Sequence, residues 1–174
     1  MRISDAKLLS LEGKFSKLAK ELKLRQKINP LKFFQHLPMQ LKFHEYLRTE
    51  GETGVLFGGN RSGKTEESSE YPITEMLERP RLRVWFCAET FPDSVNVQQR
   101  KVWDLVPKDK IRYGRYNEIT GFPNRKIMLN NFSIGVFKSY DQGTEAFASD
   151  DVDIIINDEE PPLEIVKEQR MRLV

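Results

Sequence analysis

The chain has 174 residues, 39% of them hydrophobic and 31% charged, which fits one globular domain with a sizeable core. No apolar run approaches the roughly 18 residues of a membrane-spanning helix, and the N-terminus lacks the apolar region of a signal peptide. Residues 1–50 carry 11 Lys and Arg against 5 Asp and Glu, whereas residues 140–174 carry 3 against 10. The basic N-terminal part could therefore contact nucleic acid or an acidic partner.

The first predicted element is a long amphipathic helix over residues 4–27. Its apolar side chains recur at alternating spacings of three and four, which places them on one stripe: Leu8, Leu11, Phe15, Leu18 and Leu22. Asn29-Pro30 ends this helix, and a second, short helix is expected over 39–47. The stripe must pack on the core or on another chain. We therefore interpret residues 1–38 as a helical extension and residues 39–174 as the main domain.

A complete G-x-x-x-x-G-K-[ST] motif follows, in the form Gly58-Gly59-Asn60-Arg61-Ser62-Gly63-Lys64-Thr65. The apolar segment Val55-Leu56-Phe57 leads into it, and we expect this segment to be a buried strand. The glycines allow a tight turn whose N–H groups point at an anion, at the start of a helix. The motif predicts a nucleoside triphosphate site where Lys64 contacts the β- and γ-phosphates and Thr65 binds Mg²⁺.

Strands and helices alternate after this loop. We expect a strand over 83–88, a helix over 95–105, a β-hairpin over 126–137, a strand over 152–157 and a helix over 163–173. The strands are apolar runs, which favours an α/β fold with a mostly parallel sheet flanked by helices. Cys87 lies in one such run and is expected to be a buried, unpaired core residue. His36 and His44 have no Cys or His partners at ligand spacing, so we expect no metal site from them.

Three acids, Asp158, Glu159 and Glu160, follow the strand predicted over 152–157. Ligand sites in open α/β sheets lie at the carboxyl ends of the strands, so these acids should face the phosphate loop. Asp158 is the candidate Mg²⁺-binding acid. Glu159 is the candidate general base that activates the attacking water, with Glu160 as the second choice. Asp153, at the opposite end of the strand, is interpreted as a strand-start residue.

Three segments together resemble the ATPase domain of a tailed-phage terminase large subunit over roughly residues 38–165. They are the arginine-containing phosphate loop, the sequence Ser139-Tyr140-Asp141-Gln142-Gly143 and the sequence Asp158-Glu159-Glu160-Pro161-Pro162. The resemblance implies a P-loop NTPase fold of the additional-strand, catalytic-glutamate class. Asp158 and Glu159 match the metal-binding acid and the catalytic glutamate.

The resemblance also assigns roles to two further residues. Arg61 matches the arginine that lies along the γ-phosphate and stabilises transition-state charge. Gln40 is the nearest match to a glutamine that contacts adenine. An arginine from a neighbouring subunit is a further feature, and Arg100, Arg112, Arg115 and Arg125 remain open candidates.

The implied activity is ATP hydrolysis with Mg²⁺, driving the translocation of double-stranded viral DNA into a procapsid. The implied setting is the host cytoplasm during bacteriophage assembly, with a small terminase subunit, a portal and a homo-oligomeric ring as partners and no membrane. The family continues to a coupling motif and a nuclease domain after the acid pair. We expect neither within these residues, and therefore no nuclease activity from this chain.

Three alternatives remain open from the sequence. One is a helicase-like P-loop ATPase that acts on nucleic acid. Another is a nucleotide-gated assembly module that binds ATP but turns over little alone. In the third, residues 1–38 form a docking arm for another packaging component.

Overall fold

A five-stranded mixed sheet forms the centre of the computed structural model, which describes residues 5–49, 53–59, 62–148 and 150–174. Its strand order is β2-β3-β4-β1-β5. The strands are β1 Arg83–Ala88, β2 Ile111–Tyr113, β3 Lys126–Leu129, β4 Ile134–Ser139 and β5 Ile154–Asn157.

The parallel part of the sheet consists of three adjacent strands. β1 pairs in parallel with β4 on one side and with β5 on the other. The pairs β2–β3 and β3–β4 are antiparallel. The expected hairpin over 126–137 is thus confirmed, while the expectation of a mostly parallel sheet was too broad. The physical reason is the short β3–β4 connection, because parallel neighbours require a much longer crossover.

The predicted helices are all present. The α-helices are α1 Asp5–Ile28, α2 Pro38–Thr49, α3 Lys64–Glu78, α4 Phe91–Asp93, α5 Arg100–Leu105 and α6 Leu163–Arg172. A π-helical turn, η2 Ser94–Gln99, joins α4 to α5, so the helix expected over 95–105 starts earlier. The 3-10 turns are η1 Pro30–Phe33, η3 Lys108–Lys110, η4 Pro123–Arg125, η5 Tyr140–Gln142 and η6 Thr144–Phe147.

The two faces of the sheet bury different sets of side chains, because successive residues of a strand point to opposite sides. On one face, Phe86 and Phe137 join a cluster with Ile73 and Met76 of α3 and with Val102 of α5. On the other face, the buried cluster combines Trp85 and Cys87 with Phe147 and with Ile165 of α6. Both faces of β1 are therefore buried, which matches its uninterrupted apolar sequence.

The structure does not confirm the buried strand expected over Val55-Leu56-Phe57. Residues 54–59 form no helix or strand, and Phe57 is 89% exposed. An apolar run becomes a strand only where a neighbouring strand offers its edge. Within the described residues, β5 is an edge strand of the sheet and pairs only with β1, so Val55-Leu56-Phe57 does not pair with it.

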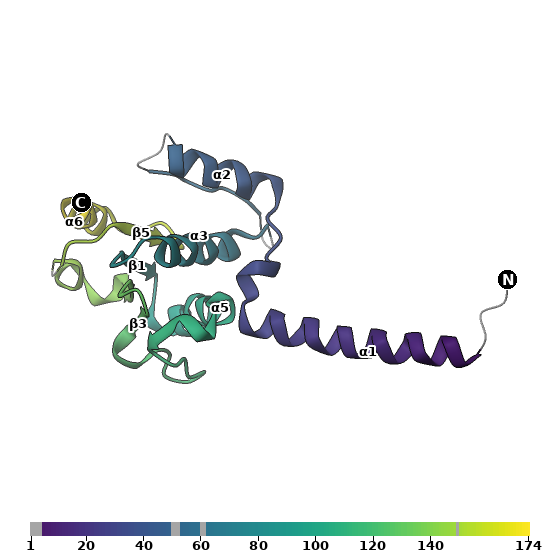
Figure 1. Cartoon of the computed structure of the whole chain (residues 1–174). Helices are drawn as coiled ribbons and strands as arrows, with labels where there is room; N and C mark the ends of the chain where they lie inside the picture. The colour runs from purple at the N-terminus through teal and green to yellow at the C-terminus, as the bar shows by residue number, and fades with distance from the viewer. Residues whose placement is uncertain (1–4, 50–52, 60–61, 149) are drawn as a thin grey trace.

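Helix α1 extends away from the sheet and its flanking helices (Figure 1). Phe15, Leu18 and Leu22 of its apolar stripe are 50% exposed or more. The stripe therefore does not pack on the core within the described part of the chain. No helix among the described residues is both long and apolar enough to cross a lipid bilayer.

Candidate nucleotide-binding site

The predicted phosphate-binding loop enters α3 through a glycine in the left-handed region. Gly63 has φ +83° and precedes Lys64, the first residue of α3. The positive φ favours glycine at this position. A Cβ at Gly58 would overlap Ser62 Oγ, so the Ser62 side chain would have to move. Asn60 and Arg61 lie outside the described residues, so their expected roles remain predictions.

The Lys64 side chain folds back over this loop. Its Nζ donates hydrogen bonds to the Gly58 carbonyl at 2.7 Å and to the Gly59 carbonyl at 3.0 Å. The lysine charge and the free N–H groups of the first turn of α3 therefore lie on the same side as the loop backbone. This combination favours an anion at the helix start.

The acid at the end of β5 meets the first turns of α3. The Asp158 N–H donates to the Cys87 carbonyl at 3.1 Å, which continues the β5–β1 pairing one residue beyond the strand. The Ser68 hydroxyl donates to Asp158 Oδ1 at 3.3 Å and lies 3.2 Å from the Thr65 carbonyl. Burial raises the pKa of Asp158, while the Ser68 hydrogen bond and the Lys64 charge oppose that rise.

Glu159, the next residue, is exposed and faces another carboxyl group. Its interaction with Glu89 is the main cause that raises the pKa of Glu159, and burial and the charge of Asp158 add to the effect. Glu89 directly follows β1, the strand beside β5, so both acids lie at the carboxyl edge of the parallel strands. Sequence reasoning missed Glu89, although its position immediately after an apolar strand was a usable signal. Glu160 is exposed and has no role that the structure assigns.

A buried tyrosine supports the backbone of the acid pair. The Tyr140 hydroxyl donates to the Glu159 carbonyl at 2.9 Å and lies 3.2 Å from Asn157 Oδ1. Asn157 in turn exchanges two amide hydrogen bonds with Gln169 of α6, at 2.9 and 3.1 Å. The Gln142 side chain accepts from the Ser139 N–H at 3.0 Å and closes the 3-10 turn that carries Tyr140. The sequence over 139–143 thus positions the sequence over 158–162.

Gln40 reaches the loop from α2 and is buried. Its Nε2 donates to the Gly63 carbonyl at 3.0 Å, and its Oε1 accepts from the Leu37 N–H at 2.7 Å. The structure therefore places Gln40 beside the start of α3, as a link between α2 and the phosphate loop. A contact with adenine remains a prediction.

The candidate trans arginines do not converge on one site. Arg112 stacks on Phe132 and Arg125 stacks on Phe91, with distances to the ring centres of 4.7 and 4.1 Å. Arg100 and Arg115 are exposed. Any of the four remains available for a contact between subunits.

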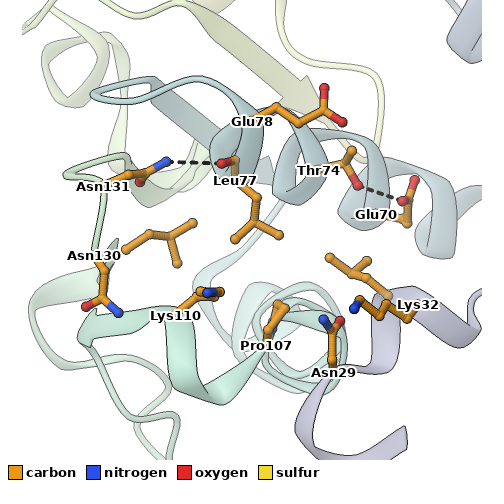
Figure 2. Close-up of a pocket in the computed structure, with 12 residues that line it drawn as sticks. Asn29, Lys32, Glu70, Thr74, Leu77, Glu78, Pro107, Lys110, Asn130 and Asn131 are labelled. Carbon is orange, nitrogen blue, oxygen red and sulfur yellow. Dashed lines mark hydrogen bonds between the residues drawn. The ribbon is translucent and has the colours of Figure 1, made fainter. Parts of the chain in front are cut away.

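A cavity of about 750 Å³ lies elsewhere, along the later turns of α3 (Figure 2). Leu77 and Thr74 of α3 line one side, and Pro107 and Asn130 line another. The phosphate-loop residues do not contribute to its lining. This cavity is therefore separate from the candidate nucleotide site.

The sheet, the loop and the acid edge together define an α/β P-loop fold. The chain shares this fold with the ATPase domain of the large terminase of Thermus phage P74-26, with a TM-score of 0.62 and 20% sequence identity. The likeness covers 82% of this chain and 63% of that chain, so these residues span less than two thirds of that protein's length. No family model matches the sequence, and no curated protein matches it.

Proposed function

We propose that this chain is an ATP-hydrolysing motor domain that drives the packaging of double-stranded viral DNA. The observation that best supports this proposal is the hydrogen bond between Ser68 of α3 and Asp158, which directly follows β5. It brings the helix that follows the phosphate loop to the acid that follows the half-buried strand β5. These are the two halves that ATP hydrolysis requires, a phosphate cradle and a metal-binding carboxylate.

Each residue of the candidate site has its own role in the proposed ATP hydrolysis. The loop N–H groups and Lys64 bind the triphosphate, and Arg61 stabilises charge on the γ-phosphate. Thr65 and Asp158 hold Mg²⁺, which neutralises phosphate charge when it is bound. Glu159 accepts the proton of the attacking water, and its raised pKa suits a base that must also release that proton. Gln40 contacts the adenine after its present hydrogen bonds rearrange.

The wider setting rests on the likeness to the terminase domain. Residues 39–174 form the ATPase domain and residues 1–38 a helical extension. DNA is held through its phosphates without sequence reading. A small terminase subunit and a portal are the expected partners in the host cytoplasm. A ring of identical chains supplies an arginine to the neighbouring nucleotide, and nuclease activity is not expected from these residues.

The test is Mg²⁺-dependent ATP hydrolysis across protein concentrations, with nucleotide binding measured in parallel. Glu159→Gln should bind ATP normally but lose turnover by at least about 100-fold, because only the proton acceptor is removed. Lys64→Ala should lose binding. Glu160→Gln is the matched control and should keep the rate. A rate per chain that rises with concentration supports the ring, whereas unchanged turnover in Glu159→Gln contradicts the proposed base.

A second candidate function is a nucleotide-gated assembly module, favoured by the exposed stripe of α1. In that case the chain binds ATP, turns over little alone and docks another packaging component through residues 1–38. Deleting residues 1–27 should abolish partner binding while leaving the melting temperature unchanged. Unchanged partner binding would exclude the docking role.

A further inference from the structure

Four side chains from three separate segments converge beside the phosphate loop. His36 follows η1, His44 lies on α2, and Glu67 and Glu70 lie on the first turns of α3. One nitrogen or oxygen atom from each lies within 4.8 Å of those of the others. The sequence offered the histidines no Cys or His partners at ligand spacing. Their neighbours in the structure are carboxylates, which the fold brings in from about 30 residues further along the chain.

Both carboxylates are buried where an anion is costly. Glu67 is 1% exposed and Glu70 is 4% exposed. Apart from the His44 imidazole, no group of the described residues donates to either oxygen of Glu67 or to Oε2 of Glu70. A buried carboxylate is strongly unfavourable unless a cation compensates it. Both carboxylates point into the same small volume.

The imidazoles approach these oxygens closely. His44 Nε2 lies 2.5 Å from Glu67 Oε1 and 3.3 Å from Glu70 Oε2, and His36 Nε2 lies 3.9 Å from Glu70 Oε1. These separations are those of ion pairs, in which a proton on His44 Nε2 would compensate the carboxylates. A metal ion at the centre of the four side chains would replace that proton and compensate both carboxylates together.

Neighbouring groups hold the four side chains in place. The His36 and His44 rings pack edge to face with centres 4.9 Å apart, and Tyr71 and Phe34 pack on their other sides. The Thr74 hydroxyl donates to Glu70 Oε1 at 2.7 Å, which Figure 2 shows. Such outer hydrogen bonds orient the ligands in protein metal sites. Glu70 also lines the 750 Å³ cavity.

We propose that His36, His44, Glu67 and Glu70 bind one divalent transition-metal ion, with Zn²⁺ as the best match. Imidazoles that ligate a metal are neutral, and the two carboxylates then carry a charge that a divalent cation cancels. Imidazole ligands select Zn²⁺ and related ions over Mg²⁺ and Ca²⁺, which prefer oxygen ligands only. The protein supplies four ligands, the number of a closed structural zinc site. The ion would tie η1 and α2 to the helix that carries Lys64.

The test uses the full chain, freed of metal with a chelator, titrated with ZnCl₂ in excess Mg²⁺ by calorimetry at neutral pH. The excess Mg²⁺ competes with Zn²⁺ for sites that offer oxygen ligands only. We expect one Zn²⁺ per chain and a higher melting temperature. His44→Gln and Glu67→Gln should each weaken Zn²⁺ binding by at least about tenfold. Even the loss of a residue that only hydrogen-bonds a ligand typically weakens metal binding by about this much.

The matched control is Glu78→Gln, which removes a different α2–α3 contact, the 3.0 Å ion pair with Arg48. It should bind Zn²⁺ like the wild type. Equal Zn²⁺ affinity in His44→Gln, or no binding by the wild type, would overturn the proposal.

X-ray absorption of the wild type with Zn²⁺ decides the question even where a variant fails to fold. His36 and His44 are the chain's 2 histidines, so two imidazole ligands per metal identify this site directly. A spectrum without imidazole scattering would overturn the proposal.

Discussion

The Tyr140 hydroxyl donates a 2.9 Å hydrogen bond to the backbone carbonyl of Glu159. The donor belongs to a 3-10 turn after β4 and the acceptor to the loop after β5. Because burial raises the pKa of Tyr140, this hydroxyl stays protonated and acts as a donor at every physiological pH. The peptide of the proposed base is therefore held by a buried hydroxyl from a separate segment of the chain.

Tyr140→Phe removes this hydrogen bond while keeping the aromatic packing with Phe147. We expect a loss of about 1 kcal/mol in the free energy of unfolding, the usual contribution of one hydrogen bond. Turnover should fall while ATP binding is kept, because only the position of Glu159 changes. Urea denaturation and steady-state ATPase assays measure the two effects. Parallel losses of binding and turnover would contradict a positioning role.

Ser68→Ala tests the contact that joins α3 to Asp158. The Ser68 hydrogen bond opposes the rise that burial causes in the pKa of Asp158. Without it, that pKa should rise further, so protons should compete with Mg²⁺ up to a higher pH. The acid limb of the pH–rate profile should therefore move to higher pH in the variant. The limb should move back as the Mg²⁺ concentration increases, and an unmoved limb would contradict the assignment.

Gly63→Ala tests the entry to α3. Gly63 has φ +83°, and an added Cβ would lie 2.9 Å from Gln40 Nε2. The left-handed conformation alone costs an alanine about 1–2 kcal/mol. We expect ATP binding to weaken about tenfold or more, measured with a fluorescent nucleotide. Gly13→Ala on α1, where a Cβ meets no atom within 4 Å, is the control and should bind normally.

Cys87 should be unreactive in the folded protein. Complete burial raises its thiol pKa to about 12, so the reactive thiolate is scarce at neutral pH. Iodoacetamide should label the chain in urea but not under native conditions, as mass spectrometry would show. The folded state keeps this proton when the unfolded state loses it, from about pH 9 upward. The free energy of unfolding should consequently fall between about pH 9 and pH 12.

Local patterns predicted much of this protein. The helices α1, α2 and α6, the strand β1 and the β3–β4 hairpin follow from periodicity and turn residues that lie within each element. That Asp158 should face the start of α3 was predictable, because a known loop motif and an acid after an apolar strand face the same edge of an α/β sheet.

The features that the sequence did not reveal depend on contacts between distant parts of the chain. Whether Val55-Leu56-Phe57 pairs as a strand depends on a neighbouring edge, and no property of the segment itself reveals one. The carboxylates beside His36 and His44 do not follow from the spacing of histidines and cysteines, because Glu67 and Glu70 come from another helix. Glu89 was overlooked because a single acid after a strand is common, and its relation to Glu159 appears only once β1 and β5 are known neighbours.

Helix α1 has a consequence for the size of the molecule in solution. Its 24 residues rise by about 36 Å, so its far end lies well outside the domain (Figure 1). A compact chain of this length would have a radius of gyration of about 16 Å. Small-angle scattering should therefore report a larger value, and a pair-distance distribution with a long tail. The helix sets a fixed reach between the nucleotide loop and anything attached at the N-terminal end.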